Sequence, residues 1–382
     1  MSDTTAGLEI IDAPALTPMV RSALGIGRAE ITSWSHAPFG HSLDEVYGTT
    51  RSIFRFSGVA QDGHREIPWA LVLKVVTAPG TPGDPSAPGN GEREPLAYRS
   101  GFLAEISGVR APRCFAVVER PSGGWWVWLE DVVDTIGREW PVERYLLAAQ
   151  HLGRFNASNP ATRMSYPWLS RSPLGDAVTE MSAGLARLGD ARDNAFVAQA
   201  ISPDAAAALH ALPSKLPAWL ARLDALPQTI CHWDAHRANL ISLEGPDGAT
   251  GTVAIDWAGV GWGPAGAELS KLLSQTVNFF GLSAGALPAL DARLFEHYVT
   301  GLKDEGWRGD ERDVRLAYAA ASAARLVVRT ATAVELALNP RARAGFERAA
   351  GLPFAALAGR FKGTLPYYLS LVDEAERLAG GA

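Results

Sequence analysis

Strand-like and helix-like patterns occupy separate parts of this 382-residue chain. The strand-like part comes first, from Ile31 to Thr77, with an alternating stretch from Ile53 to Phe56 and a nearly continuous apolar run from Trp69 to Val76. Two further strands are predicted at Arg113–Glu119 and Trp125–Leu129. This grouping constrains the fold strongly, because an alternating β-α-β sheet would need a helix between successive strands.

Helical spacing dominates after Val132, interrupted by one short β island from Thr229 to Trp257. Within that island, strands at Asn239–Leu243 and Thr252–Ile255 flank the turn Gly245–Gly248. Segregation of strands from helices favours the α+β class. The predicted helices span 92–105, 141–158, 174–200, 203–225, 265–280, 286–305, 310–338 and 353–378.

The length of the chain suits two lobes better than one compact core. We expect a strand-rich first domain over residues 1–131 and a helical second domain over residues 132–382. Residues 1–28 form a leader of the first domain, with a short helix that begins at Thr17 and closes at Gly25.

The composition argues against several classes of protein. Net charge is −6, the pI is about 5.8 and no run of Lys or Arg occurs, so a nucleic-acid partner is not expected. Two distant cysteines, Cys114 and Cys231, make no disulfide framework. The most apolar stretch, Ala317–Leu338, contains three charged residues, so we expect a helix packed in protein and no membrane span. The start shows no signal peptide, which predicts a cytoplasmic location.

The strongest chemical signal is the segment from His232 to Asn239, which reads His-Trp-Asp-Ala-His-Arg-Ala-Asn. Asp256 follows Asn239 after 17 positions, at the end of an apolar strand. Phosphoryl transfer needs a carboxylate that receives or orients a hydroxyl proton, and oxygen ligands that hold magnesium against phosphates. Asp234, Asn239 and Asp256 supply such groups, and a hairpin between the last two can bring both metal ligands together.

This segment resembles the HxDxHxxN signature of the aminoglycoside phosphotransferase and choline kinase family, followed by that family's Ile-Asp-Trp/Phe. His236 is similar to the histidine of the small-molecule kinases, where protein kinases usually have lysine. The resemblance implies a two-lobed protein-kinase-like fold, with an antiparallel-sheet N-lobe and a mainly helical C-lobe. It also implies that Asp234 is the catalytic base, that Asn239 and Asp256 bind Mg2+, and that His232 orients the loop.

Four positions depart from the family pattern or vary it. The family often has Gly where Trp233 stands, and Pro-Gly where Arg237-Ala238 stands. Glu268 follows the metal-binding Asp256 at a distance where the family often has an Asp that braces the loop, so we interpret Glu268 as structural.

Lys74 lies inside the apolar run Trp69–Val76, where a lysine is costly to bury unless it is paired. It is one of five lysines in a chain with thirty arginines. Glu92 or Glu94 opens the next helix, as the Lys–Glu pair of a kinase requires. The family pattern of a glutamate followed by an aromatic residue fits Glu94 and Tyr98, while Glu92 stays open because Pro95 adjoins Glu94. Lys74 would hold the α- and β-phosphates of ATP.

Two further segments are assigned to nucleotide binding by resemblance. Trp128–Val132 resembles the Leu-Glu-Asp-Leu linker of the family, whose backbone groups bond adenine, which assigns Glu130 and Val132 to this role. Phe39–Ser42, followed by Val46-Tyr47, resembles the family's Gly-x-Ser turn, and Ser42 with backbone amides would touch phosphate.

Other residues allow structural interpretations. Cys231 reads as a small buried hydrophobic residue. Arg325 and Arg329 lie one helical turn apart and could bind an anionic group or pair with acids. Trp257 and Trp262 could stack on a substrate ring or pack in the core.

The glycine turn, strand lysine, helix glutamate, linker, catalytic loop and metal-binding aspartate follow one another in the order that a kinase requires. We therefore expect an ATP- and Mg2+-dependent transfer of the γ-phosphoryl group to a hydroxyl of a small molecule: an amino sugar, an aminoglycoside-like antibiotic or a choline-like alcohol. The sequence fixes neither that alcohol nor the oligomeric state.

Two alternatives compete with a kinase. One is a metal-dependent hydrolase that binds zinc through His232, Asp234 and His236. That interpretation leaves Lys74 and Asn239 without a role. The other is a relative that binds nucleotide without turnover, which the retained Asp234 argues against.

Overall fold

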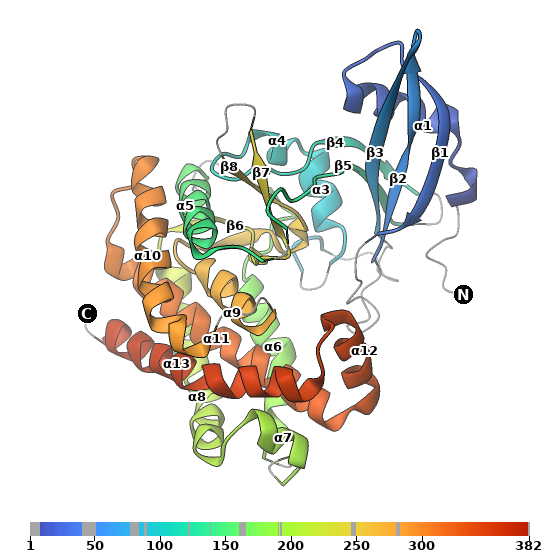
Figure 1. Cartoon of the computed structure of the whole chain (residues 1–382). Helices are drawn as coiled ribbons and strands as arrows, with labels where there is room; N and C mark the ends of the chain where they lie inside the picture. The colour runs from blue at the N-terminus through green and yellow to red at the C-terminus, as the bar shows by residue number, and fades with distance from the viewer. Residues whose placement is uncertain are drawn as a thin grey trace. The chain divides into compact units, whose positions relative to one another are not determined.

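The computed structural model describes residues 8–39, 51–76, 84–87, 90–120, 123–137, 139–159, 166–189, 191, 193–245, 250–279 and 283–380. The chain divides into two compact units (Figure 1). The first comprises Met1–Glu105 with Ala111–Val133, and the second comprises Ile106–Arg110 with Asp134–Ala382. The sequence-based boundary lies near Asp131 and does not anticipate the short excursion at Ile106–Arg110.

A five-stranded antiparallel sheet forms the frame of the first unit, in the order β1-β2-β3-β5-β4. Two short helices follow β3 and precede β4. The elements are β1 (Glu30–Pro38), β2 (Arg51–Asp62), β3 (Arg65–Val76), α3 (Arg93–Arg99), α4 (Phe102–Glu105), β4 (Cys114–Glu119) and β5 (Trp125–Glu130).

Helix α1 (Ala13–Leu24) precedes the sheet, after a 3-10 turn at Leu8–Ile10. The predicted start of this helix at Thr17 is wrong, because Asp12 caps it one turn earlier and accepts a hydrogen bond from the amide of Ala15 at 2.9 Å. The predicted end is correct: Gly25 adopts a left-handed conformation with φ 68°.

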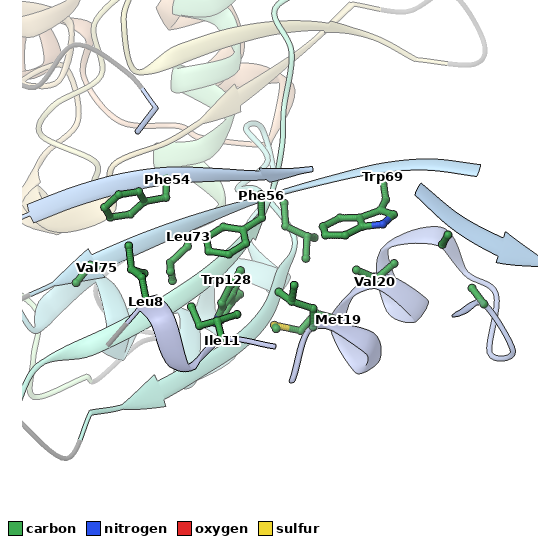
Figure 2. Packing of buried hydrophobic residues seen from close by; sticks show 14 residues of the cluster. Leu8, Ile11, Met19, Val20, Phe54, Phe56, Trp69, Leu73, Val75 and Trp128 are labelled. Atoms are coloured by element: carbon green, nitrogen blue, oxygen red, sulfur yellow. The ribbon is translucent and has the colours of Figure 1, made fainter. Parts of the chain in front are cut away.

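One face of the sheet packs against α1 and the preceding turn, as Figure 2 shows. Alternate residues point to this face, because side chains along a strand alternate between the two faces of a sheet. Leu73 and Trp128 are cross-strand partners within this cluster. Lys74, which follows Leu73 and pairs with Val127, therefore projects from the opposite face. The buried cluster contains Leu8, Ile11, Leu16, Met19, Val20, Ala29, Phe54, Phe56, Ala60, Trp69, Leu71, Leu73, Val75 and Trp128.

The second unit contains the β island, made of two separate antiparallel ribbons. β6 (Gln228–Cys231) pairs with β9 (Gly261–Pro264), and β7 (Leu240–Glu244) pairs with β8 (Thr250–Ala254). The sequence did not predict β9. The backbone of Arg110 forms a parallel bridge with Val253 of β8, which explains why Ile106–Arg110 belongs to this unit.

Helices make up most of the second unit. α5 lies beside α10, and α11 packs against α6 and α13 (Figure 1). The helices are α5 (Val142–Ser158), α6 (Pro173–Ala186), α7 (Ala195–Ala200), α8 (Pro203–Ala225), α9 (Leu269–Phe279), α10 (Leu287–Asp304), α11 (Glu311–Leu338), α12 (Pro340–Ala350) and α13 (Phe354–Gly380), with 3-10 turns at Trp257–Gly259 and Ala284–Ala286.

Three helix predictions need correction. The predicted helix 92–105 is two helices, α3 and α4, because Gly101 between them adopts a left-handed conformation with φ 78°. The predicted helix 174–200 is two helices, because the Asn194 side chain accepts hydrogen bonds from the amides of Phe196 and Val197 and starts α7 anew. α12 was not predicted; Asn339 caps it in the same way, with Pro340 in its first turn.

The apolar stretch Ala317–Leu338 lies within α11, whose small side chains are largely buried in the protein. Among the residues that the structure describes, no helix is both long and apolar enough to cross a membrane. The N-terminal part is built on an antiparallel sheet and the C-terminal part is mainly helical, so the predicted α+β class is confirmed.

Candidate active site

The loop between β6 and β7, residues 232–239, turns through an unusual backbone conformation. Trp233 has φ 64° and Asp256, just after β8, has φ 61°. Within the described residues these are the non-glycine positions with positive φ, and a bulky residue in this region is under strain. Such strain persists only where surrounding contacts hold the backbone, and it is common at functional sites.

His232 is fully buried, and its ring contacts backbone groups of the loop and of the residue after β8. Its Nε2 lies 2.9 Å from the Ile255 carbonyl oxygen, and its Nδ1 accepts the amide of Asp234 at 3.2 Å. Burial lowers the pKa of His232, although the nearby Asp234 and Asp256 act in the opposite direction. A neutral ring that uses both nitrogens in this way links the start of the loop to the end of β8, and it has no nitrogen left for zinc.

Asp234 is held by three side chains. One carboxylate oxygen, Oδ1, lies 2.8 Å from Lys271 Nζ. The other, Oδ2, accepts the Asn239 amide at 2.6 Å and lies 3.5 Å from His236 Nε2. Burial raises the pKa of Asp234, but Lys271 and His236 outweigh it and hold that pKa well below its ordinary value. The carboxylate is therefore ionised and fixed in direction.

Asn239 and Asp256 meet at the same end of the β7/β8 ribbon. Leu240 pairs with Ala254, and the amide of Ile255 donates to the Asn239 carbonyl at 2.9 Å, so Asp256 stands one residue beyond this contact. The Asn239 side chain turns its nitrogen toward Asp234, which leaves the amide oxygen as the atom that could hold a metal ion. An amide oxygen and a carboxylate suit Mg2+, which prefers oxygen ligands.

The zinc alternative finds no matching geometry. Across the described part of the chain, no three His, Cys, Asp or Glu side chains are grouped so that they could hold a metal ion by themselves. The His232 ring is already used in backbone contacts, and the His236 Nδ1 accepts the amide of Ala238 at 3.2 Å.

Glu268 holds the start of the loop by accepting hydrogen bonds from its backbone. Its Oε1 accepts the amides of His232 at 2.6 Å and Trp233 at 3.2 Å, while its Oε2 accepts the Asn156 side-chain nitrogen at 2.9 Å. Asn156 in turn accepts the Tyr298 hydroxyl at 2.5 Å. The Glu268 side chain is buried, and burial raises its pKa to about 7 despite these hydrogen bonds. The structural role predicted for Glu268 agrees with these contacts.

Arg325 of α11 holds the strained residue. It donates to the Trp233 carbonyl and to the Ser270 hydroxyl, at 2.9 and 2.8 Å. The Trp233 indole N–H donates to the Trp262 carbonyl at 2.9 Å. The amide, carbonyl and indole nitrogen of Trp233 are thus all bonded, which explains how a tryptophan keeps a backbone conformation that favours glycine. Sequence reasoning missed this use of Arg325.

Arg237 holds the C-terminal part of the loop 232–239. Its guanidinium donates to the carbonyls of Leu240, at 3.0 Å, and Gly137, and it lies 3.1 Å from the Asp134 carboxylate. It also stacks over Trp140, 4.3 Å from the ring centre. These contacts explain how the loop is fixed although Arg237 stands where the family often has proline.

The structure bears on two of the other interpretations. Cys231 is fully buried, which agrees with a small buried hydrophobic residue, and burial raises the pKa of its thiol well above its ordinary value. Trp257 is a core residue that packs on the His232 ring, with 4.5 Å between ring centres. Trp262 is half-buried and accepts the Trp233 indole N–H through its backbone carbonyl, a contact that does not choose between the two interpretations of its side chain.

The first unit holds the lysine–glutamate pair. Lys74 Nζ of β3 lies 2.5 Å from Glu94 Oε2 of α3, and the two side chains are 7% and 1% exposed. Of the two glutamates considered, Glu94 is the one that contacts Lys74. Glu92 stands just before α3, as the residue that flanks the start of the helix.

Glu130 ends β5 and Val132 follows it, both in the first unit. The Glu130 amide donates to the Arg113 carbonyl at 2.9 Å, so a bound base would have to use another group of this residue. Val132 is half-buried. Ser42 and its glycine turn lie outside the described residues, so their assignment stays a prediction.

A family model described as "Phosphotransferase enzyme family" matches residues 99–310, more than half of the chain. The matched range contains the loop 232–239, Asp256 and Glu268, and it begins after Lys74 and Glu94. No match was found among the curated proteins.

Several solved structures are similar to the chain at low sequence identity. An aminoglycoside phosphotransferase from Streptomyces rimosus is 17% identical, with 82% of this chain and 98% of that chain covered and a TM-score of 0.43. An aminoglycoside phosphotransferase from Alicyclobacillus acidocaldarius is 16% identical, with 84% and 92% covered and a TM-score of 0.46. A Plasmodium vivax ethanolamine kinase is 12% identical, with 88% and 83% covered and a TM-score of 0.49.

Proposed function

Because the chain belongs to the phosphotransferase enzyme family, we propose that it transfers the γ-phosphoryl group of ATP to a hydroxyl of a small molecule, with Mg2+. The observation that carries this proposal is the Asp234 carboxylate, held ionised and bonded to Asn239 at the end of the ribbon that Asp256 follows. A base and two oxygen ligands at one end of one ribbon are what phosphoryl transfer to an alcohol requires.

The site residues of the second unit each have a defined role in this proposal. Asp234 orients the acceptor hydroxyl and receives its proton. Asn239 and Asp256 hold Mg2+, which neutralises charge on the phosphates. His232, Glu268 and the residues bonded to them keep the loop rigid, so that catalysis depends on positioning and fixed charges.

The first unit binds the nucleotide in this proposal. Lys74, kept in place by Glu94, bonds the α- and β-phosphates. Backbone groups of Glu130 and Val132 bond the adenine, and Ser42 touches phosphate. The buried Lys74–Glu94 pair supports this assignment, because a lysine in an apolar strand is costly to bury unless it is paired.

The acceptor that we propose is an amino sugar, an aminoglycoside-like antibiotic or a choline-like alcohol, the kinds of alcohol used by the family that the catalytic loop resembles. The net charge of −6 agrees with a cationic acceptor. The proposed location is the cytoplasm, where ATP and magnesium are available and where cysteines such as Cys114 and Cys231 stay free.

The test is ATP turnover with a panel of such alcohols, for the wild-type protein and for Asp234→Asn. We expect one class of alcohol to stimulate turnover, and we expect D234N to bind ATP and to lose turnover. Equal turnover by D234N would refute the assignment of the base. Zinc bound tightly to the purified protein, with hydrolysis that needs no ATP, would favour the metallohydrolase instead.

A further inference from the structure

Lys271 is the residue of the second unit that contacts Asp234 most closely from outside the loop, and no motif led to it. It lies in the first turn of α9, and its Nζ is 2.8 Å from Asp234 Oδ1. Its side chain is 19% exposed and that of Asp234 is 31% exposed, so the pair is neither sealed in the core nor free in solvent. This inference rests on the function proposed above.

A purely structural role explains the position of Lys271 poorly. The first turn of a helix carries partial positive charge, so a lysine there is unfavourable where an acidic residue would be stabilising. The chain contains only five lysines against thirty arginines. Lysine differs from arginine at this position in a way that matters for the proposed role. Its compact ammonium on a flexible chain can change hydrogen-bond partners more easily than the planar guanidinium of an arginine.

The chemistry of the transfer places charge next to this ammonium group. The acceptor oxygen attacks the γ-phosphorus while the bond from phosphorus to the β–γ bridging oxygen breaks, so that ADP leaves with that electron pair and the acceptor proton passes to Asp234. The acceptor oxygen must lie about 2.6–3.2 Å from the Asp234 carboxylate. It must also lie about 3–3.5 Å from phosphorus in a reactive arrangement. An ammonium bonded to that carboxylate thus adjoins the oxygens of the transferring group.

We propose that Lys271 is a further catalytic residue of this site, which holds Asp234 in direction and bonds the transferring phosphoryl group as negative charge spreads over its oxygens. Lys271 has three N–H donors, and its contact with Asp234 Oδ1 uses one of them. The Asp234 Oδ2 is held separately by Asn239 and His236, so the carboxylate keeps its direction when the ammonium turns toward phosphate. A positive charge that bonds the transferring group as its negative charge grows stabilises the transition state more than the bound substrate.

The experiment compares binding of ADP with binding of ADP plus aluminium fluoride, both with Mg2+, by titration calorimetry. Aluminium fluoride with ADP imitates the transferring phosphoryl group, so no acceptor needs to be known. We expect the wild type to bind the fluoride complex more tightly than ADP, and Lys271→Met to bind ADP within about twofold of wild type while losing most of that difference. Lys271→Arg should recover part of it, because the charge is kept while the shape changes.

The matched control is Lys303→Met, a substitution of an exposed lysine on α10 that pairs with Glu311. It should leave both affinities unchanged. With an active acceptor, kcat of K271M should fall by about 10²–10³ with little change in the KM for ATP. The inference is overturned if K271M keeps the wild-type difference, or if it loses ADP affinity in the same proportion. A wild type that binds ADP but turns over no alcohol would contradict the proposed function and not this role of Lys271; a wild type that does not bind ADP would contradict both.

Discussion

The Lys74–Glu94 pair should have two separate effects, on the stability of the first unit and on its binding of ATP. Substitutions of the two residues can distinguish these effects. Lys74 and Glu94 are 7% and 1% exposed and 2.5 Å apart, so Lys74→Met leaves a carboxylate buried without its cation. Breaking a buried pair in this way costs about 3–5 kcal/mol. Since about 1.4 kcal/mol corresponds to a tenfold change in an equilibrium constant, local opening of β3 and α3 should become about 10²- to 4 × 10³-fold more frequent.

Hydrogen exchange followed by mass spectrometry measures this opening directly in peptides from β3 and α3. The double variant K74M/E94Q should restore most of the protection, because the uncompensated charge is gone, and yet it should still fail to bind ATP. Arg28→Met, which breaks an exposed pair with Asp62 in the same unit, is the control and should leave exchange in β3 unchanged.

Two results would refute this reasoning. If K74M exchanges at the wild-type rate, the pair does not contribute to stability as its burial implies. If K74M/E94Q binds ATP as tightly as the wild type, Lys74 has no part in holding the phosphates.

Three further predictions concern the loop 232–239 and the residues around it. Arg325→Met removes the donor to the Trp233 carbonyl, so kcat should fall by about tenfold or more with the ATP affinity kept; unchanged kinetics would show that the loop is held without it. Burial raises the pKa of Glu268 from its ordinary 4.5 to about 7, so its contribution to stability, about 3 kcal/mol, is complete below pH 4.5 and is lost as the pH rises through about 7. Melting temperatures between about pH 4.5 and about pH 8 should therefore fall more in the wild type than in Glu268→Gln, and parallel curves would contradict the shift. Cys231 should resist iodoacetamide in the native protein, as judged by mass spectrometry, and rapid labelling would contradict its burial.

Local patterns in the sequence were enough for the parts of the site that lie close together along the chain. The loop from His232 to Asn239 and the ribbon that leads to Asp256 span a short segment, and their geometry follows from one hairpin. Lys74 could be singled out because a lysine is conspicuous in an apolar strand.

Contacts between distant parts of the chain could not be predicted in this way. Arg325 bonds a carbonyl 92 positions away, and Glu268 bonds an amide 36 positions away. Periodicity predicted a helix around each of them, but it did not indicate which face meets the loop. Lysine is scarce in this chain, which could have drawn attention to Lys271. Only the contact of Lys271 with Asp234 in the structure shows why the residue matters.

Some element boundaries were missed for a related reason. Asn194 starts a new helix through its side chain inside what reads as one continuous helical pattern, 174–200. Asn339 starts α12 in the same way, directly after the predicted end of the preceding helix at residue 338. β9 exists because β6 offers it a partner, and its own residues are Gly, Trp, Gly and Pro, which do not read as a strand.

The central claim is tested most directly by following the γ-phosphoryl group of labelled ATP. Wild-type protein with Mg2+ and an acceptor alcohol should carry the label into a stable phosphate monoester of that alcohol, and Asp234→Asn should not. Label that remains in ATP, or that appears only as inorganic phosphate whichever alcohol is supplied, would contradict the account.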